Sequence, residues 1–240
     1  MTAAPPTTPV APVAAVPPRG GVIGFVVRYP WVVGVVLGVV ALTAMRGCQS
    51  RRLAELPVLG TVPDFALTTH SGAPITQRDL DQKVWIASFF FTSCQTTCPA
   101  IMQAMNEVAA GIQAGLPQTS RIQLVSFSVD PEVDTPAELT RYAADRKLDL
   151  SRWHLVTGAR KELEALVMGG FKTAVGDKVE KAGIIDISHS MKLVLVDGER
   201  HIRHYFSASD AKDRETIVAY AIDMAKALDA AAAETPESRP

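Results

Sequence analysis

The stretch KVWIASFFFTSCQTTCP, residues 83–99, joins an apolar run to a pair of cysteines and decides how the rest of the chain is interpreted. Lys83–Phe91 is apolar almost throughout, which is typical of a strand buried on both faces of a sheet. After the cysteines, apolar residues recur at helical spacing, at Ile101, Met105, Val108 and Ile112. The cysteines are therefore expected where a buried strand ends and a helix begins.

That junction suits reactive or metal-binding thiols. Sites in open α/β sheets form at the carboxyl ends of strands, and the partial positive charge at a helix N-terminus lowers the pKa of a cysteine. Pro99 can open the helix because the first helical N–H needs no partner. Cys94 and Cys98 are separated by three residues, one more than in the usual thioredoxin pair, so their sulfurs can still meet in a disulfide or on one metal ion. Thiolates select Cu(I), or Zn in closed sites.

The plainer alternative is that both cysteines pack as small apolar residues. The polar residues between them, Gln95-Thr96-Thr97, favour an exposed functional loop instead.

Elsewhere strands and helices alternate. Further strands are expected at Arg121–Val129, Trp153–Thr157, Met191–Val196 and His201–Phe206, the last two joined by the turn residues Asp197-Gly198. Further helices are expected from the capping sequence Thr135-Pro136-Ala137-Glu138 to about Arg146, over Lys161–Met168, and over about Asp210–Ala231. This order predicts an α/β domain over residues 61–232, with a mixed sheet and helices on both faces.

The N-terminal part has a different composition. Residues 1–20 hold six prolines and are expected to be a disordered tail, as is the segment 233–240. The apolar run 22–45 is long enough for a transmembrane anchor, which needs about 20 residues. A cleavable signal peptide is the alternative, disfavoured by the long preceding tail and the lack of a small-x-small site. Residues 46–60 are a linker, in which Cys48 is left unassigned between lipidation, a link between chains and simple packing.

Charge restricts the partners. Residues 51–240 carry 21 Lys and Arg against 25 Asp and Glu, a net charge of −4, which argues against nucleic acid and suits metals, small molecules or a protein. Arg46, Arg51 and Arg52 follow the apolar run, and the positive-inside rule applied to them alone would place the domain in the cytoplasm.

A metal held by two thiolates needs further ligands, and five histidines are candidates. His70 lies in a turn and is expected to be solvated, His154 to be structural, and His201 and His204 to point to opposite faces of one strand. His189 lies in a polar segment just before the strand Met191–Val196, and we rank it modestly above the others.

Four features occur in a suggestive order. They are Cys94-x-x-x-Cys98-Pro99 after a strand ending in Phe-Thr, the stretch SVDPEVDTP at 128–136, Trp153 followed by Thr157-Gly158, and His189-Ser190 before a strand that ends in Asp197-Gly198. Together they resemble the Sco/SenC family of membrane-anchored copper chaperones, over roughly Thr61 to Ala231.

The resemblance implies a thioredoxin-like fold, one N-terminal membrane span, and a domain outside the cytoplasm, on the periplasmic side in a bacterium, which would override the arginine count. It implies one copper ion bound by Cys94, Cys98 and His189. It also implies delivery of copper to the copper-bearing subunit of cytochrome c oxidase, or reduction of the thiols of that site.

The chain departs from the family pattern at two points. Family members commonly carry Pro-Asp between the cysteines, where this chain has Gln95-Thr96-Thr97, and Asp before the histidine, where it has Ser188. An acidic neighbour supports an imidazole ligand, so its absence bears on copper affinity and partner choice. Asp130 and Asp134 are expected to shape a loop near the site without doing chemistry. Met191 is expected to be a core residue, the alternative being a weak extra ligand through its thioether.

Three functions compete. The first is a copper chaperone, and the chain is expected to be a metallochaperone rather than an enzyme. The second is a membrane-anchored thiol–disulfide oxidoreductase without a stable metal, in which Cys94 attacks and Cys98 resolves the mixed disulfide. The third is a thiol peroxidase, ranked last because no basic residue lies within Thr92–Met105 to activate a thiolate.

Overall fold

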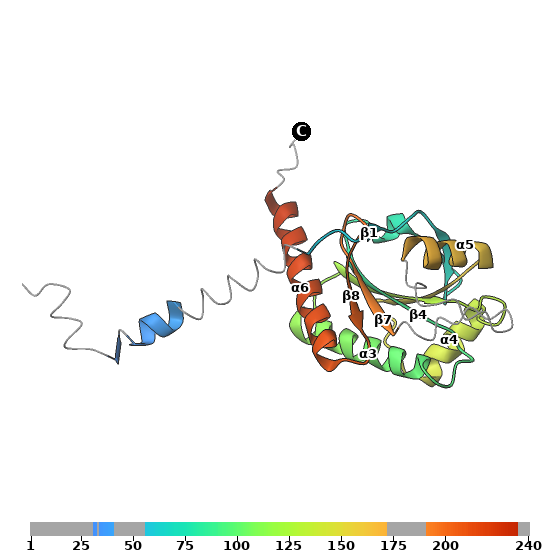
Figure 1. The fold of residues 1–240 in the computed structure, drawn as a ribbon, viewed down its shortest axis with the longest axis horizontal. Helices are drawn as coiled ribbons and strands as arrows, with labels where there is room; N and C mark the ends of the chain where they lie inside the picture. Colours follow the sequence, from blue (N-terminus) through green and yellow to red (C-terminus); the bar gives the residue numbers. More distant parts are fainter. Residues whose placement is uncertain (1–30, 33, 41–55, 172–190, 235–240) are drawn as a thin grey trace, which may run out of the picture. The chain divides into compact units, whose positions relative to one another are not determined.

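The computed structural model describes residues 31–32, 34–40, 56–171 and 191–234 (Figure 1). The chain divides into two compact units, residues 1–49 and 50–240. In the first unit, residues 31–32 and 34–40 are helical, and apolar side chains such as Trp31 and Leu37 are exposed. Within the described residues, no helix combines the length and the apolar character that crossing a bilayer requires.

Several expectations fall on other parts of the chain. The tail at 1–20, most of the apolar run 22–45 and Cys48 lie outside the described residues, and so do Ser188 and His189.

A mixed sheet of eight strands forms the middle of the second unit, in the order β1-β8-β7-β4-β5-β6-β2-β3. The strands are β1 (Gly60–Thr61), β2 (Ala66–Thr69), β3 (Pro74–Thr76), β4 (Val84–Phe90), β5 (Ile122–Ser128), β6 (Trp153–Thr157), β7 (Lys192–Val196) and β8 (His201–Ser207). Strands β4, β5 and β6 are parallel, and β7 joins the other side of β4 in the antiparallel sense. All seven residues of β4 are buried, as its continuous apolar run predicts.

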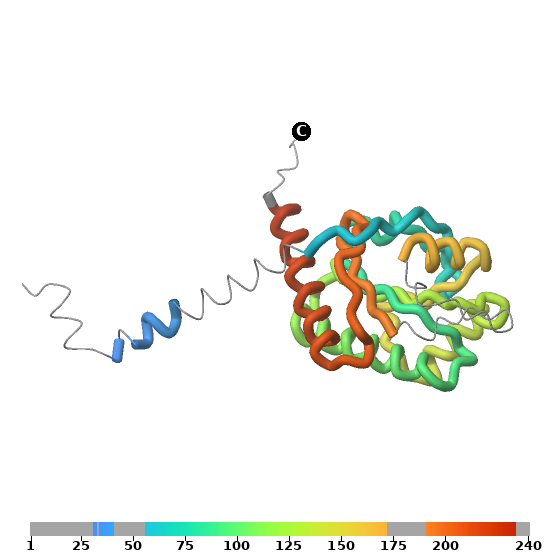
Figure 2. Tube along the Cα trace, viewed as in Figure 1, coloured from blue at the N-terminus to red at the C-terminus, as the bar shows by residue number. Residues whose placement is uncertain are grey.

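Helices cover both faces of this sheet, which confirms the predicted layering. The helices are η1 (Gln77–Leu80), α3 (Cys98–Gly115), α4 (Pro136–Asp145), α5 (Arg160–Glu164), the π-helical turn η2 (Ala165–Gly170) and α6 (Ala211–Glu234). Helices α3 and α6 lie side by side (Figure 1) and, with α4, pack on one face of the sheet. The gold α5–η2 segment packs with residues 62–80 on the other face (Figure 2).

Alternation along β4 divides its side chains between the two cores. Val84, Ile86 and Phe90 join the α3 side, whereas Trp85, Ala87 and Phe89 join the α5 side. The five strands and four helices expected from the sequence are all present. Strands β1, β2 and β3 were not anticipated, because with two to four residues each they are too short to show a period.

The hairpin between β7 and β8 forms as expected, but for a different reason. The left-handed residue of its turn is Arg200, with φ of 69°, and Gly198 is not in that conformation. A Cβ on Gly198 would lie 3.2 Å from the Cα of Gln82, whose N–H donates to the Gly198 carbonyl at 2.8 Å. Glycine is therefore needed here for close approach of two backbones.

A buried hydrogen-bond chain links the three parallel strands. Ser88 Oγ and Ser126 Oγ lie 2.6 Å apart, Trp153 Nε1 donates to Ser126 Oγ at 2.9 Å, and all three residues are fully buried. Removing the Ser126 oxygen leaves the indole N–H of Trp153 without an acceptor in a part of the core that water does not reach.

We therefore expect Ser126→Ala to lower the free energy of unfolding by about 1–3 kcal/mol, the usual cost of a buried unpaired donor. Urea unfolding followed by circular dichroism measures this. The control is Ser209→Ala, which removes an exposed hydroxyl bonded to Ser207 and should change stability by less than about 0.5 kcal/mol. Equal effects of the two substitutions would contradict the role given to Ser126.

Candidate metal centre

The two cysteines occupy the predicted junction between a buried strand and a helix. Strand β4 ends at Phe90, a loop follows, and α3 begins at Cys98 with Pro99 in its first turn. The chain leaves the sheet here because β4 is central, so its continuation must pass over the carboxyl edge of the parallel strands.

The loop between β4 and α3 is exposed at its polar residues, whereas the two cysteine side chains are buried. Gln95 and Thr96 are exposed, but Cys94 is 9% exposed and Cys98 5%, and both belong to the core on the α3 side. Neither is in a disulfide. The backbone N–H of Cys98 donates to Cys94 Sγ at 3.3 Å, and Thr96 Oγ1 lies 3.8 Å from the same sulfur. The first N–H groups of a helix have no helical acceptor, so the Cys94 sulfur caps this one.

The surroundings make the two thiols unequal. Burial alone would raise the pKa of Cys94, but hydrogen bonds from the Cys98 thiol and from the N–H groups of Cys98, Thr96 and Thr97 outweigh it and lower that pKa to about 7. Burial, the hydrogen bond with Cys94 and the negative charges of Cys94 and Asp134 raise the pKa of Cys98 to about 12. Near neutral pH, a negative charge on the pair therefore resides on Cys94.

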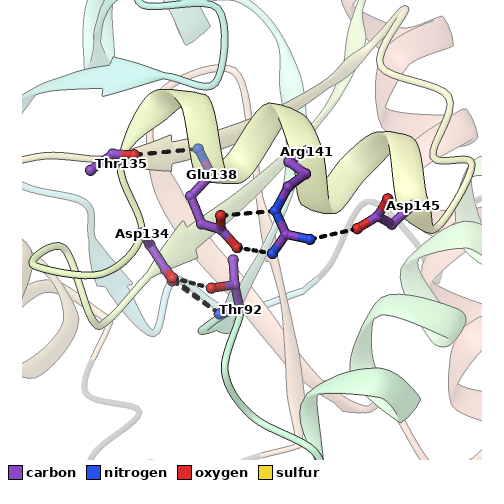
Figure 3. A network of polar contacts seen from close by, with 6 residues as sticks. All are labelled: Thr92, Asp134, Thr135, Glu138, Arg141 and Asp145. Carbon is purple, nitrogen blue, oxygen red and sulfur yellow. Dashed lines mark hydrogen bonds and ion pairs between the residues drawn. The ribbon is translucent and has the colours of Figure 1, made fainter.

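A buried carboxylate holds the start of the loop (Figure 3). Asp134 is fully buried between β5 and α4, and it accepts the N–H of Thr92 at 3.1 and 3.2 Å on its two oxygens. It also accepts the Thr92 hydroxyl in a very short contact, and the Ser128 hydroxyl at 2.5 Å. Burial raises the pKa of Asp134, against the lowering effect of these bonds. The sequence placed Asp134 in a loop near the site but did not indicate this contact.

An aromatic side chain lies in the same core cluster as the cysteines. Tyr142 of α4 is 5% exposed, its ring lies 5.4 Å from that of Phe90, and the Arg146 guanidinium covers it at 4.4 Å. Burial raises the pKa of Tyr142 to about 12, and negative charge on Cys98 and Cys94 adds to the shift. Its hydroxyl has no hydrogen-bond partner among the residues that the structure describes. Nothing in the sequence distinguished this tyrosine from a core residue.

The described histidines are engaged elsewhere. His70 Nδ1 accepts the Leu155 N–H at 3.4 Å, so His70 is less solvated than its turn suggested. His154 Nε2 bonds with Gln123 Oε1 at 3.2 Å, in agreement with a structural role. His201 faces the hairpin carboxylates of Asp197 and Glu199, and His204 packs on the ring of Phe206. The structure describes His189 at no point, so its position as a ligand stays a prediction.

The two cysteines are the metal donors that remain, and they supply part of a ligand set for a soft metal. Two free cysteines lie four residues apart at the N-terminus of α3, and soft thiolates are ligands that select Cu(I). Across the described ranges, no group of three or more His, Cys, Asp and Glu side chains is arranged to hold a metal ion. Met191 is half-buried and packs against the core on the α3 side, as a core methionine would.

Comparison with known proteins agrees with this architecture. A family model described as SCO1/SenC matches residues 56–226. The chain is 30% identical over 153 residues to the SCO1 protein homolog of Bacillus subtilis (strain 168), covering 63% of this chain and 77% of that protein. It is 26% identical over 157 residues to a protein of Stutzerimonas stutzeri named as a candidate copper-binding protein, covering 64% and 72%.

The fold is also similar to a solved structure. BsSco, described as a member of the Sco family of cytochrome c oxidase assembly proteins with a disulfide switch, is 26% identical. It superimposes with a TM-score of 0.60 over 71% of this chain and 96% of its own. This likeness supports the thioredoxin-like fold expected from the resemblance.

The inequality of the thiols leads to a pH prediction for the reduced, metal-free protein. Iodoacetamide attacks thiolates, so its rate at Cys94 should rise through pH 7 and level off about one unit above the pKa, while Cys98 stays unreactive until strongly alkaline pH. Peptide mapping by mass spectrometry follows both sites. Cys98→Ala removes one hydrogen-bond donor to Cys94 and should move the Cys94 midpoint upward. Equal reactivity of the two cysteines at pH 7 would contradict the assignment.

Proposed function

The chain belongs to the SCO1/SenC family, and on that premise we propose that it is a copper chaperone that holds one copper ion through Cys94, Cys98 and His189. The observation that carries the proposal is the pair of free, adjoining thiols at the junction of β4 and α3. Copper is the cargo of such a protein, so the site must hold the ion and also release it.

The chemistry of the donors supports this role. Thiolates bind Cu(I) strongly, and Cys94 with a pKa of about 7 is half ionised near neutral pH before any metal arrives. The proton on Cys98 has to leave when copper binds, so loading releases protons and strengthens as the pH rises. Three ligands leave room for a fourth from a recipient. An incoming thiol or imidazole can therefore join the site before a donor of this chain departs.

The recipient is proposed from the relatives. BsSco is described as one of the cytochrome c oxidase assembly proteins, so the proposed partner is the copper-bearing subunit of that oxidase. We also propose that the apolar run 22–45 anchors the chain as a single span, with the domain on the periplasmic side. An anchor would confine the chaperone to the membrane that holds its recipient.

A thiol–disulfide oxidoreductase is the second candidate, favoured by the low pKa of Cys94 and the high pKa of Cys98. The Cys94 thiolate would attack a disulfide of the partner, forming a mixed disulfide and releasing one partner thiolate. Cys98 would then lose its proton and attack the Cys94 sulfur, which releases the second partner thiolate and leaves a Cys94–Cys98 disulfide. The partner gains two electrons and the pair loses two.

Copper loading separates the two candidates. The reduced protein is loaded with Cu(I) under nitrogen and desalted, and copper per chain is then counted. We expect about one copper per chain, lost in Cys94→Ser/Cys98→Ser and held less tightly in His189→Ala, because soft thiolates carry most of the binding. The matched control is His204→Ala, which removes an exposed histidine packed on Phe206 and should leave copper unchanged.

The contrary outcomes are specific. Copper affinity that is the same in His189→Ala and the parent protein would remove His189 from the ligand set. No retained copper, together with reduction of a disulfide substrate that requires Cys94, would replace the chaperone by the oxidoreductase. In that case Ser188, in place of the usual acidic neighbour, would be the first position to examine.

A further inference from the structure

The loop that carries Cys94 is held at its two ends by different parts of the fold. At its far end Cys98 is the first residue of α3, a helix of 18 residues packed against β4 and α6. At its near end Thr92 has left the sheet, and its N–H and hydroxyl are both bound by the carboxylate of Asp134. Cys94 lies between these supports, with its own N–H donating to the Phe91 carbonyl at 3.3 Å.

Asp134 is itself fixed by the structure around it. Its N–H donates to the Asp130 carbonyl at 2.9 Å, and the next residue, Thr135, caps α4 by accepting the Glu138 N–H at 3.3 Å. The Ser128 hydroxyl at the end of β5 donates to its carboxylate at 2.5 Å. One fully buried residue therefore joins the end of β5, the start of α4 and the loop that leaves β4. Figure 3 shows its contacts with Thr92. Hydrogen bonds to a charged, buried acceptor are among the stronger ones in proteins.

We propose that Asp134 is a positioning residue for the Cys94/Cys98 pair, which acts through Thr92 to hold Cys94 against the N-terminus of α3. This rests on the proposed function only in taking the two cysteines as the working pair. Asp134 touches neither sulfur in any described contact. Its effect is to remove conformational freedom from Cys94, the member of the pair that lies outside the helices and strands.

The effect of Asp134 can be measured from how readily the disulfide between Cys94 and Cys98 forms. A disulfide between Cys94 and Cys98 forms more readily when both sulfurs are already held at the required separation, because less conformational freedom is lost on closing the bond. Releasing Thr92 frees the loop in the reduced protein and leaves the bond to be closed at greater cost. Loss of the Asp134 contact should therefore shift the equilibrium from the disulfide toward the dithiol.

The experiment uses the full-length, metal-free protein in glutathione buffers of varied ratio. Each disulfide formed in the protein consumes one oxidised glutathione and yields two glutathione thiols, so atoms and electrons balance. Samples are quenched with acid and alkylated, and peptide mapping gives the fraction of the Cys94–Cys98 disulfide separately from Cys48. The equilibrium constant follows from the midpoint.

We expect Asp134→Asn to lower that equilibrium constant about tenfold, as the loss of charged hydrogen bonds would. Thr92→Val keeps the Asp134 charge and the Thr92 N–H but removes the hydroxyl, and should lower the constant about threefold. Asp145→Asn is the matched control. It makes the same substitution at the last residue of α4, the helix that begins just after Asp134, where Asp145 forms an exposed ion pair with Arg141. It should leave the constant within about 1.5-fold.

Thermal unfolding of each variant is recorded in parallel. A melting temperature lowered in Asp134→Asn with an unchanged disulfide equilibrium would overturn the proposal, since Asp134 would then stabilise the fold without positioning the pair. If Asp134→Asn does not fold, Thr92→Val decides, and an unchanged constant in that folded variant overturns the proposal equally. Copper takes no part, so a protein that binds no copper could still give the predicted shift, and the two proposals can fail separately.

Discussion

The backbone hydrogen bonds that hold β4 between β5 and β7 are the constraint on which the rest of the site depends. These bonds cover the two edges of β4, along its whole length beside β5 and at Trp85–Ala87 beside β7, and the two core clusters cover its faces. All of β4 is buried, so the chain becomes accessible only where the strand ends. The parallel partner β5 ends beside it and supplies Ser128 and, after a short turn, Asp134. Because parallel strands finish at the same edge, a loop after β4 and a loop after β5 must meet there. The hydrogen bonds between Thr92 and Asp134 are the contact between these two loops.

The environment at that edge explains why two chemically identical thiols differ. Cys94 faces N–H groups of the loop and of the first turn of α3, whereas Cys98 lies deeper, among apolar side chains, where the negative charges of Cys94 and Asp134 act on it. Hydrogen-bond donors favour the thiolate, and burial with nearby negative charge disfavours it. The separation of roles between an ionised and a protonated sulfur thus follows from their positions along one turn of chain. The same separation serves proton-coupled metal loading and stepwise disulfide exchange.

Much of this could be predicted from the sequence, and the parts that could not share a cause. β4, β5 and α3 carry long apolar patterns, and the cysteine pair stands at a recognisable junction, so these elements and their order were accessible. Strands β2 and β3 could not be predicted, because they pair through the backbone and are too short to show a periodic pattern of apolar residues. Asp134 was located in a loop, but its bond to Thr92 spans 42 residues of sequence, and only the folded sheet brings the two together. Tyr142 acquires its place near the cysteines by the same long-range packing.

The departure of the cysteine loop from its family pattern bears on the acidity of Cys94. An insert containing Asp would put a carboxylate next to Cys94 and raise its pKa by repulsion. The insert here, Gln95-Thr96-Thr97, is uncharged, so no such repulsion opposes the backbone N–H groups that lower that pKa. A more available thiolate favours Cu(I) binding and attack on a disulfide alike, so thiol acidity does not discriminate between them. The difference has to come from a donor that only the metal requires. Under the proposed function that donor is His189, the third ligand that a site retaining copper would need and that a disulfide exchange would not.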